Sequence, residues 1–215
     1  MIEFKNISIK GYEQVVCFTD LDIGLNAIIA IHSTTLGPSL GGCRMWDYQN
    51  KEEALTDVLR LSKGMTYKAA IAGLKLGGGK SVIIGNSKTD KSEDLFKSFG
   101  RFIEGLGGRY ITAEDVGTSI KDMDYVRMET KYVTGISKSF GGSGDPSLLT
   151  AFGTYLGIKA SVQHKLKKNN LKGLSVSVQG LGSVGIELIK YLTNDGMKVF
   201  GCDIDKESIK EAEEK

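Results

Sequence analysis

The segment LSVSVQGLGSVG, residues 174–185, decides the fold class of this chain. Its first half alternates serine and valine, which is typical of a strand, and its second half carries the glycine pattern G-x-G-x-x-G. Apolar residues at Leu188, Ile189 and Leu192 predict a helix next, and the following strand KVFGCDID contains Asp203 near its end. A strand, a glycine turn, a helix and an acid in this order predict a dinucleotide-binding βαβ unit of the Rossmann type.

The glycines of this unit predict where a cofactor binds. In this motif the first glycine (Gly180) makes the tight turn, the second (Gly182) lets the backbone approach a pyrophosphate, and the third (Gly185) lets the helix pack closely on the strand. Asp203, 23 residues after Gly180, is placed to bind a ribose hydroxyl, and Asp205 is the alternative. Because a carboxylate repels a 2′-phosphate, NAD is favoured over NADP.

The rest of the chain alternates predicted strands and helices. Strands are expected at QVVCFTD, LNAIIAIHSTT, KSVIIG and RYITAEDVG, with a loop at residues 37–47 and a connector at 124–147. Helices are expected at 52–63, 66–73, 92–106 and 149–160, and the first two are separated by a pause near Gly64. This alternation indicates an α/β fold. We expect an N-terminal α/β catalytic domain, residues 1–135, followed by an incomplete Rossmann domain, residues 136–215, with a glycine- and serine-rich segment at 141–147 near the boundary.

Composition narrows the classes of function. The net charge is only +2 and the lysines are scattered among acids, so neither a nucleic acid nor a membrane is expected as a partner. Cys17, Cys43 and Cys202 form no C-x-x-C pair, which argues against a disulfide framework and a metal site. With no signal-peptide pattern at the start, the protein is expected to be cytoplasmic and to bind small molecules or copies of itself.

The segment LKLGGGKSVIIG, residues 74–85, invites comparison with a phosphate-binding P-loop. A P-loop has glycine six positions before its lysine, where this chain has Leu74, and it opens a helix, whereas SVIIG predicts a strand. The glycines therefore indicate a close approach of backbone, with Lys80 at the mouth of the strand.

Lys68 and Lys80 flank this glycine-rich bend. Two ammonium groups in a closed cleft repel each other, so one of them would lose its proton near neutral pH and serve as a base while the other binds a carboxylate. The alternative is that both are solvated surface lysines.

Five segments resemble the glutamate/leucine/phenylalanine/valine dehydrogenase family, in order and over essentially the whole chain: TTLGPSLGGCRMW, LSKGMTYKAAIAGLKLGGGKSVIIG, GRYITAEDVGTS, TKYVTGIS and VQGLGSVG. The resemblance implies that Lys80 activates water and that Asp115 handles the amino group and its proton. It implies that Lys68 binds the substrate α-carboxylate, with Gly41, Gly42 and Met65 beside it. For the cofactor, it implies Thr150 at the nicotinamide end and a dinucleotide site that contains Gly180, Gly182, Ser183, Val184 and Asp203.

The implied reaction is NAD-dependent oxidative deamination of an L-amino acid to the 2-oxo acid, ammonia and NADH. Leu40 stands where glutamate-specific relatives place a lysine, and an apolar wall favours a branched aliphatic side chain, L-leucine first and valine or isoleucine next. Phenylalanine, valine or glutamate dehydrogenase activity of the same family is the alternative.

Family members extend well beyond the last residues of this chain, and a lone βαβ unit leaves a parallel sheet with open edges. The 215 residues are therefore expected to be a truncated product or a fragment, whose activity stays open. We also expect a homo-oligomer, and a truncated, non-catalytic oligomerising module is the alternative from a different class of function.

Overall fold

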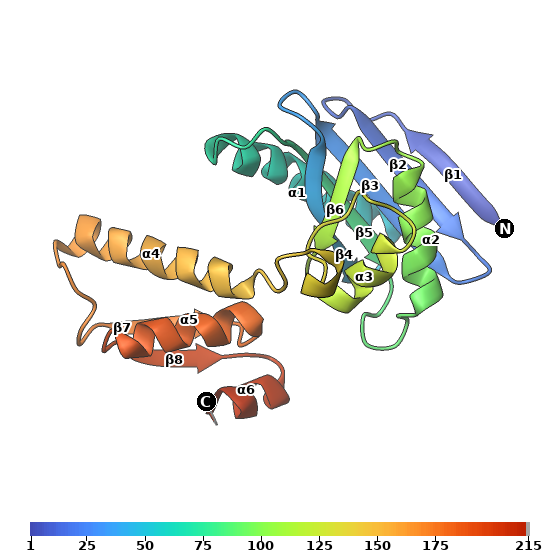
Figure 1. The fold of residues 1–215 in the computed structure, drawn as a ribbon. Coiled ribbons are helices and arrows are strands. Elements are labelled where there is room, and N and C mark those ends of the chain that lie inside the picture. The colour runs from blue at the N-terminus through green and yellow to red at the C-terminus, as the bar shows by residue number, and fades with distance from the viewer. Residues whose placement is uncertain (214–215) are drawn as a thin grey trace. The chain divides into compact units, whose positions relative to one another are not determined.

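The computed structural model describes residues 1–213, and the chain divides into two compact units, the first Met1–Gly144 and the second beginning at Asp145 (Figure 1). The division falls within the glycine- and serine-rich segment 141–147. The domain limits drawn from the sequence, 1–135 and 136–215, stay predictions. Each unit is described by itself.

The first unit is built on a six-stranded mixed sheet with the order β1-β2-β3-β5-β4-β6. The strands β1, β2, β3 and β5 pair antiparallel, and β4 lies parallel to both of its neighbours, β5 and β6. The strands are β1 Ile2–Ile7, β2 Gln14–Asp20, β3 Leu25–Ser33, β4 Ser39–Trp46, β5 Gly77–Ile84 and β6 Tyr110–Glu114. Because β4, β5 and β6 run the same way, the residues that follow them meet at one edge of the sheet.

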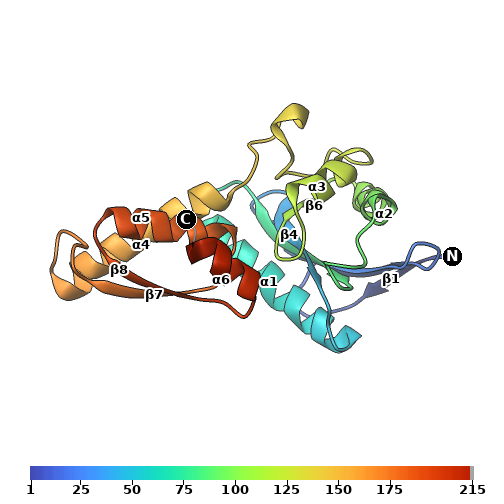
Figure 2. The ribbon, with the colours of Figure 1, turned by 90° about the horizontal axis from the view of Figure 1, so that it is seen from below.

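Helices cover both faces of this sheet, α1 on one and α2 with α3 on the other (Figure 2). They are α1 Lys51–Ile71, α2 Glu93–Glu104 and α3 Ile120–Arg127, and a single 3₁₀ turn follows at Lys138–Phe140. All three helices begin at a side-chain N-cap, from Asn50, Ser92 and Ser119. The helix predicted at 92–106 is confirmed by α2, whose apolar stripe is buried: Leu95, Phe96, Phe99, Phe102 and Ile103.

The second unit is the predicted βαβ unit preceded by a long helix. It comprises α4 Ser147–Leu166, β7 Ser175–Gln179, α5 Ser183–Asn194, β8 Lys198–Cys202 and α6 Lys206–Glu213. The strands β7 and β8 are parallel, and α5 packs on both strands and against α4. A small core that includes Ala151, Leu171 and Leu192 joins these elements. The sequence also predicts the start of a further helix at KESIKEAEEK, residues 206–215, and the last two of these residues lie outside the described residues.

Residues 37–47 contain the strand β4 and not the predicted loop. A side chain at Gly41 would place its Cβ 1.8 Å from the Gly79 carbonyl oxygen, and one at Gly42 would place it 2.5 Å from that of Glu114. The two glycines therefore mark close approach between neighbouring strands, although glycine commonly indicates a turn.

Two further expectations were wrong, and one strand was not foreseen. Helix α1 runs without a pause through Gly64, since the packing of its apolar face outweighs the roughly 1 kcal/mol that an interior glycine costs. The start of the predicted connector, residues 124–127, belongs to α3, whose buried apolar residues are Met123 and Val126. The strand β1 was not predicted, because nearly all of its residues are exposed. No helix in the described part of the chain is long and apolar enough to cross a bilayer.

Candidate active site

Lys80 and Asp115 form an ion pair in the part of the sheet where β5, β4 and β6 run parallel. Lys80 lies in β5 and is only 5% exposed, and its Nζ is 2.8 Å from Asp115 Oδ2. Asp115 directly follows β6. The two residues are 35 positions apart, and the parallel register of β5, β4 and β6 brings them together. A buried ammonium next to a carboxylate is an arrangement that can move a proton.

The turn after β6 holds the Asp115 backbone in place. The Asp115 N–H donates to Thr118 Oγ1 at 2.9 Å, and that hydroxyl donates to the Cys43 carbonyl of β4 at 2.8 Å. Gly117 has φ 81°, and a Cβ there would lie 2.0 Å from the Met45 carbonyl oxygen. Only glycine fits this left-handed, crowded position, which explains the sequence pattern EDVGT.

The glycine run before Lys80 packs against the protein's own backbone. Gly77, Gly78 and Gly79 are part of the strand β5, so the predicted glycine-rich bend is an extended strand. A Cβ at Gly77 would lie 2.0 Å from the Ser33 carbonyl oxygen, and one at Gly78 would lie 2.1 Å from the Thr66 amide nitrogen in α1. The glycines therefore allow β5 to lie tightly under α1 and beside β3.

The predicted substrate residues surround this strand. Gly42 lies beneath Asp115, because a Cβ there would come within 2.8 Å of the Asp115 Cβ. Gly41 and the half-buried Leu40 precede it on β4, where Leu40 pairs with Gly78 of β5. The glycine pair, Lys80 and Asp115 are thus brought together as neighbours.

Met65 and Lys68 lie on the C-terminal part of α1, the helix that packs on β5. Met65 is half-buried and Lys68 is exposed. The charged partner of Lys80 in the described structure is the carboxylate of Asp115. The predicted pairing of the Lys68 and Lys80 ammonium groups stays a prediction.

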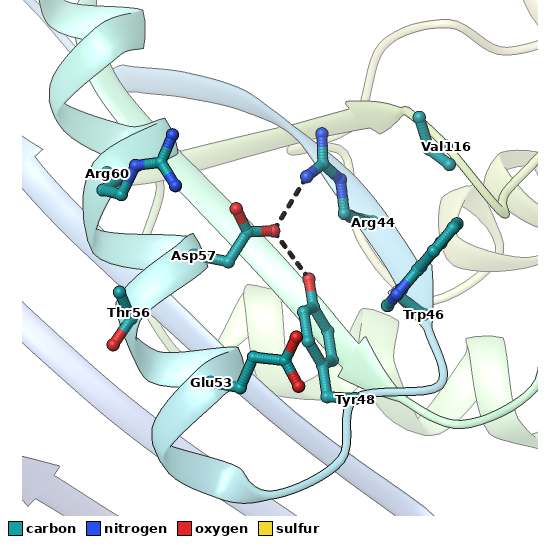
Figure 3. A pocket seen from close by; sticks show the side chains of 8 residues that line it. All are labelled: Arg44, Trp46, Tyr48, Glu53, Thr56, Asp57, Arg60 and Val116. Carbon is teal, nitrogen blue, oxygen red and sulfur yellow. Dashed lines mark hydrogen bonds and ion pairs between the residues drawn. The ribbon is translucent and has the colours of Figure 1, made fainter.

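A second cation reaches the same carboxylate, and the sequence reasoning missed it. Arg44 Nε lies 3.2 Å from Asp115 Oδ2, the oxygen that Lys80 also contacts. Arg44 Nη1 lies 2.8 Å from Asp57 Oδ2 on α1, and the Tyr48 hydroxyl donates to that oxygen at 2.8 Å (Figure 3). These contacts join five side chains into one continuous network, which we call the charged chain: Lys80, Asp115, Arg44, Asp57 and Tyr48.

Charge and burial set the protonation of the groups at the far end of the charged chain. Burial opposes the charge on Arg44, but the nearby Asp115 and Asp57 carboxylates outweigh it and raise the pKa of Arg44. Burial, followed by the bond to Asp57, raises the pKa of Tyr48, so its phenol stays neutral and donates. Below the sheet, burial raises the pKa of the Cys43 thiol to about 12.

A cavity of about 610 Å³ opens beside the charged chain (Figure 3). Arg44, Tyr48 and Asp57 form part of its wall, together with Trp46, Glu53, Thr56, Arg60 and Val116. None of the predicted substrate residues lines it. The one signal in the sequence for this region is Arg44 within GGCRMW, a charged side chain directly after the glycine pair.

The glycine turn of the second unit has the geometry that a dinucleotide requires. Gly180 has φ 95°, and a Cβ at Gly185 would lie 2.0 Å from the Gly180 carbonyl oxygen. Gly182 is the N-cap of α5 and faces open space, and the first turn of α5 contains no acid. Ser183 and Val184 begin that helix, so their amides belong to its positive end.

Asp203 lies against the glycine turn. Its Oδ2 accepts from the Leu181 N–H at 2.7 Å and its Oδ1 from the Asp205 N–H at 2.8 Å, and these bonds lower the pKa of Asp203. Asp205 in turn accepts from the Glu207 N–H at the start of α6. In α4, the Thr150 hydroxyl is exposed and donates to the Pro146 carbonyl at 3.0 Å. The residues present therefore suit a dinucleotide.

A mixed sheet that carries a buried lysine and a separate unit with a glycine-turn βαβ define the class, that of α/β proteins with a Rossmann-type unit. Residues 13–132 match the family model described as Glu/Leu/Phe/Val dehydrogenase, dimerisation domain, and residues 141–212 match the one described as Glutamate/Leucine/Phenylalanine/Valine dehydrogenase. The chain belongs to this family, which confirms the resemblance seen in its motifs.

Individual relatives agree with this membership. The chain is 56% identical to the leucine dehydrogenase of Geobacillus stearothermophilus, over 98% of this chain and 58% of that protein, and 53% identical to the valine dehydrogenase of Streptomyces virginiae, over 93% and 56%. Among solved structures, L-tryptophan dehydrogenase from Nostoc punctiforme is similar with a TM-score of 0.66 and 43% identity, over 95% of this chain and 57% of that one. The chain thus spans under two thirds of the length of these relatives.

Proposed function

We propose that the protein is an NAD-dependent amino acid dehydrogenase that oxidatively deaminates a branched-chain L-amino acid, L-leucine first, to the 2-oxo acid and ammonia. The observation that carries the proposal is the buried Lys80–Asp115 pair above Gly42. Family membership and the leucine dehydrogenase relatives support it.

The chain's own residues supply binding and proton transfer. Lys68, exposed on α1, binds the substrate α-carboxylate, and the glycine backbone at Gly41 and Gly42 leaves room for the substrate over β4. Asp115 accepts a proton from the substrate amino group. When bound, NAD supplies the hydride acceptor. Water that adds to the resulting imino carbon gives a proton to Lys80 Nζ, and Asp115, 2.8 Å away, relays protons to and from that atom.

The dinucleotide binds the second unit at Gly180, Gly182, Ser183, Val184, Gly185 and Asp203, with Thr150 at the nicotinamide end. The preference for NAD follows from Asp203. Its pKa is lowered by the Asp205 and Leu181 amides, so it is a carboxylate at neutral pH and repels a 2′-phosphate.

The side-chain preference follows from Leu40. An apolar residue at this position leaves a second substrate carboxylate without a charged partner, which disfavours glutamate. Leucine, valine and isoleucine differ by one or two methyl groups, and a methyl group changes binding by only about 1–3 kcal/mol, so one pocket accepts all three.

The test is an assay of NADH formation with leucine, valine, isoleucine, phenylalanine and glutamate. We expect the highest kcat/KM with leucine and no turnover with NADP in place of NAD. The Lys80→Ala variant should lose deamination while its circular dichroism spectrum and unfolding midpoint stay close to those of the parent. Near-normal turnover by that variant, or a preference for glutamate, would contradict the proposal.

We also propose a cytoplasmic homo-oligomer. The family model that matches residues 13–132 is described as a dimerisation domain, and the described cysteines Cys17, Cys43 and Cys202 are unpaired thiols. Light scattering should give a mass of at least two chains, and a monomer at micromolar concentration would count against the proposal.

A further inference from the structure

The oxygen Asp115 Oδ2 is shared by two cations, Lys80 and Arg44. We infer that Arg44 is a positioning residue of the proposed reaction: it holds Asp115 as a carboxylate, and it weakens the stabilisation that this carboxylate gives to the protonated form of Lys80. The reaction context rests on the proposed function, but the proton equilibrium of Lys80 is a property of the chain itself.

The sharing of one oxygen is the first step. A carboxylate alone beside Lys80 favours the charged ammonium, and a lysine that keeps its proton cannot accept one from water. The guanidinium of Arg44 stays charged at all accessible pH values. It therefore competes for the Asp115 charge without ever titrating, and it keeps Asp115 ionised when Lys80 is neutral.

The geometry fixes Arg44 in this place. It lies on β4 with its Nε on Asp115 and its Nη1 on Asp57, so the guanidinium bridges two carboxylates from different elements. The Tyr48 hydroxyl secures the far carboxylate. The side chains of Arg44 and Asp115 are each 24% exposed, so the pair is only partly screened by water.

Other titratable and charged side chains belong to the elements around Lys80. On β3, burial lowers the pKa of His32, ahead of repulsion by Lys63, so its imidazole is neutral at neutral pH. Cys43 on β4 and Glu114 on β6 pair with one another in register and belong to the opposite face of the sheet. On α1, Lys68 adds positive charge and Asp57 adds negative charge, the latter bound to Arg44. Arg44 is the cation in direct contact with the charge that holds Lys80.

The expected direction of the effect follows from distance and charge. Through the shared oxygen the two cationic groups are within about 6 Å of each other, a separation at which two like charges repel each other appreciably. Removal of the Arg44 charge should raise that midpoint. Removal of the Asp57 charge, which leaves the Arg44 charge less compensated, should lower it.

The experiment is an NMR titration of the chain with 13C-labelled lysine, in which the Lys80 Cε signal is assigned by its loss in Lys80→Arg. We expect the midpoint to rise in Arg44→Met, which loses a nearby positive charge, and to fall in Asp57→Asn, which keeps an acceptor for Tyr48. The matched control is Arg60→Met, because Arg60 lines the same cavity but, within the described part of the chain, makes no ion pair with Asp115. It should leave the midpoint unchanged.

The outcomes separate the inference from the proposed function. If Arg44→Met leaves the midpoint in place, or if Arg60→Met moves it equally, Arg44 has only a structural role and the inference fails. If Arg44→Met does not fold, the fall in Asp57→Asn decides, and no fall overturns the inference. Since the titration needs no turnover, absence of deamination in the parent protein would refute the proposed function alone. Where turnover is present, the acid limb of kcat/KM in Arg44→Met should shift to higher pH by the same amount.

Discussion

Replacement of Gly78 by alanine should destabilise the first unit, and the structure sets the size of the effect. The new Cβ would lie 2.1 Å from both the amide nitrogen and the Oγ1 of Thr66, and 2.5 Å from its Cα. Carbon atoms pack at about 3.5–4.0 Å, so α1 or β5 must move by more than about 1 Å. Backbone atoms of a long helix cannot rotate away as a side-chain end can.

Overpacking of this kind costs about 1–3 kcal/mol, and loss of glycine freedom in the unfolded chain returns at most about 1 kcal/mol. We expect the free energy of unfolding to fall by about 2 kcal/mol, a large share of the roughly 5–15 kcal/mol typical of a domain. A shift of α1 also moves Met65 and Lys68 relative to Lys80. The substrate KM of the active protein should therefore rise together with the loss of stability.

Urea unfolding followed by tryptophan fluorescence is the assay, because Trp46 is the single tryptophan and belongs to the first unit. Gly64→Ala is the matched control: the same substitution in α1, where the new Cβ meets nothing within 4 Å apart from its chain neighbours and the helix's own backbone. It should stabilise by about 0.5–1 kcal/mol. If Gly78→Ala and Gly64→Ala change the stability alike, the tight contact between α1 and β5 does not explain the glycine run.

Two further predictions concern buried groups beneath the site. The Tyr110 hydroxyl donates to the Gly41 carbonyl at 2.6 Å and lies 2.9 Å from Ser81 Oγ. Because Tyr110→Phe leaves a buried oxygen unsatisfied, it should lower the free energy of unfolding in urea by about 1–3 kcal/mol. A loss below about 0.5 kcal/mol would refute this. Burial raises the pKa of the Cys43 thiol from 9.0 to about 12, so the folded state binds this proton more tightly than the unfolded state does. The difference contributes to the free energy of unfolding. The contribution is complete below pH 9 and is lost as the pH rises toward 12. Between those values the parent should lose up to about 1.4 kcal/mol per pH unit more than Cys43→Ala, and equal slopes in the two unfolding series would contradict the assignment.

The sequence predicted elements whose burial is regular and missed those whose signals conflict. The unbroken apolar run of β3 and the stripe of α2 belong to the cores, so periodicity identified them. In β4 the glycines at 41 and 42 conceal a central strand, because their role is close contact with strands that are distant in sequence. The α3 helix is short and buries little apolar surface, so its pattern was too weak to separate from a connector.

In the candidate site, too, the residues with a local sequence signal were predicted and those placed by tertiary packing were missed. Lys80 and Asp115 stood out through motifs that resemble a known family, each readable within a few residues. The link from Arg44 to Asp57 was not readable, because it depends on α1 folding back over β4 so that a residue in the second turn of the helix meets a strand residue 13 positions earlier. A contact of that kind follows from tertiary packing, and no local pattern specifies it.

This contact changes how the proton of Lys80 is to be explained. The sequence suggested that Lys68 repels it, which stays a prediction, and Lys68 is an exposed lysine whose charge is screened by water. Arg44 is held by two carboxylates, stays charged, and touches the very oxygen that stabilises the Lys80 ammonium. The requirement for a second positive charge is the same in both accounts. A fixed guanidinium on the sheet meets that requirement within the chain itself, and under the proposed function Lys68 would then be available for the substrate carboxylate.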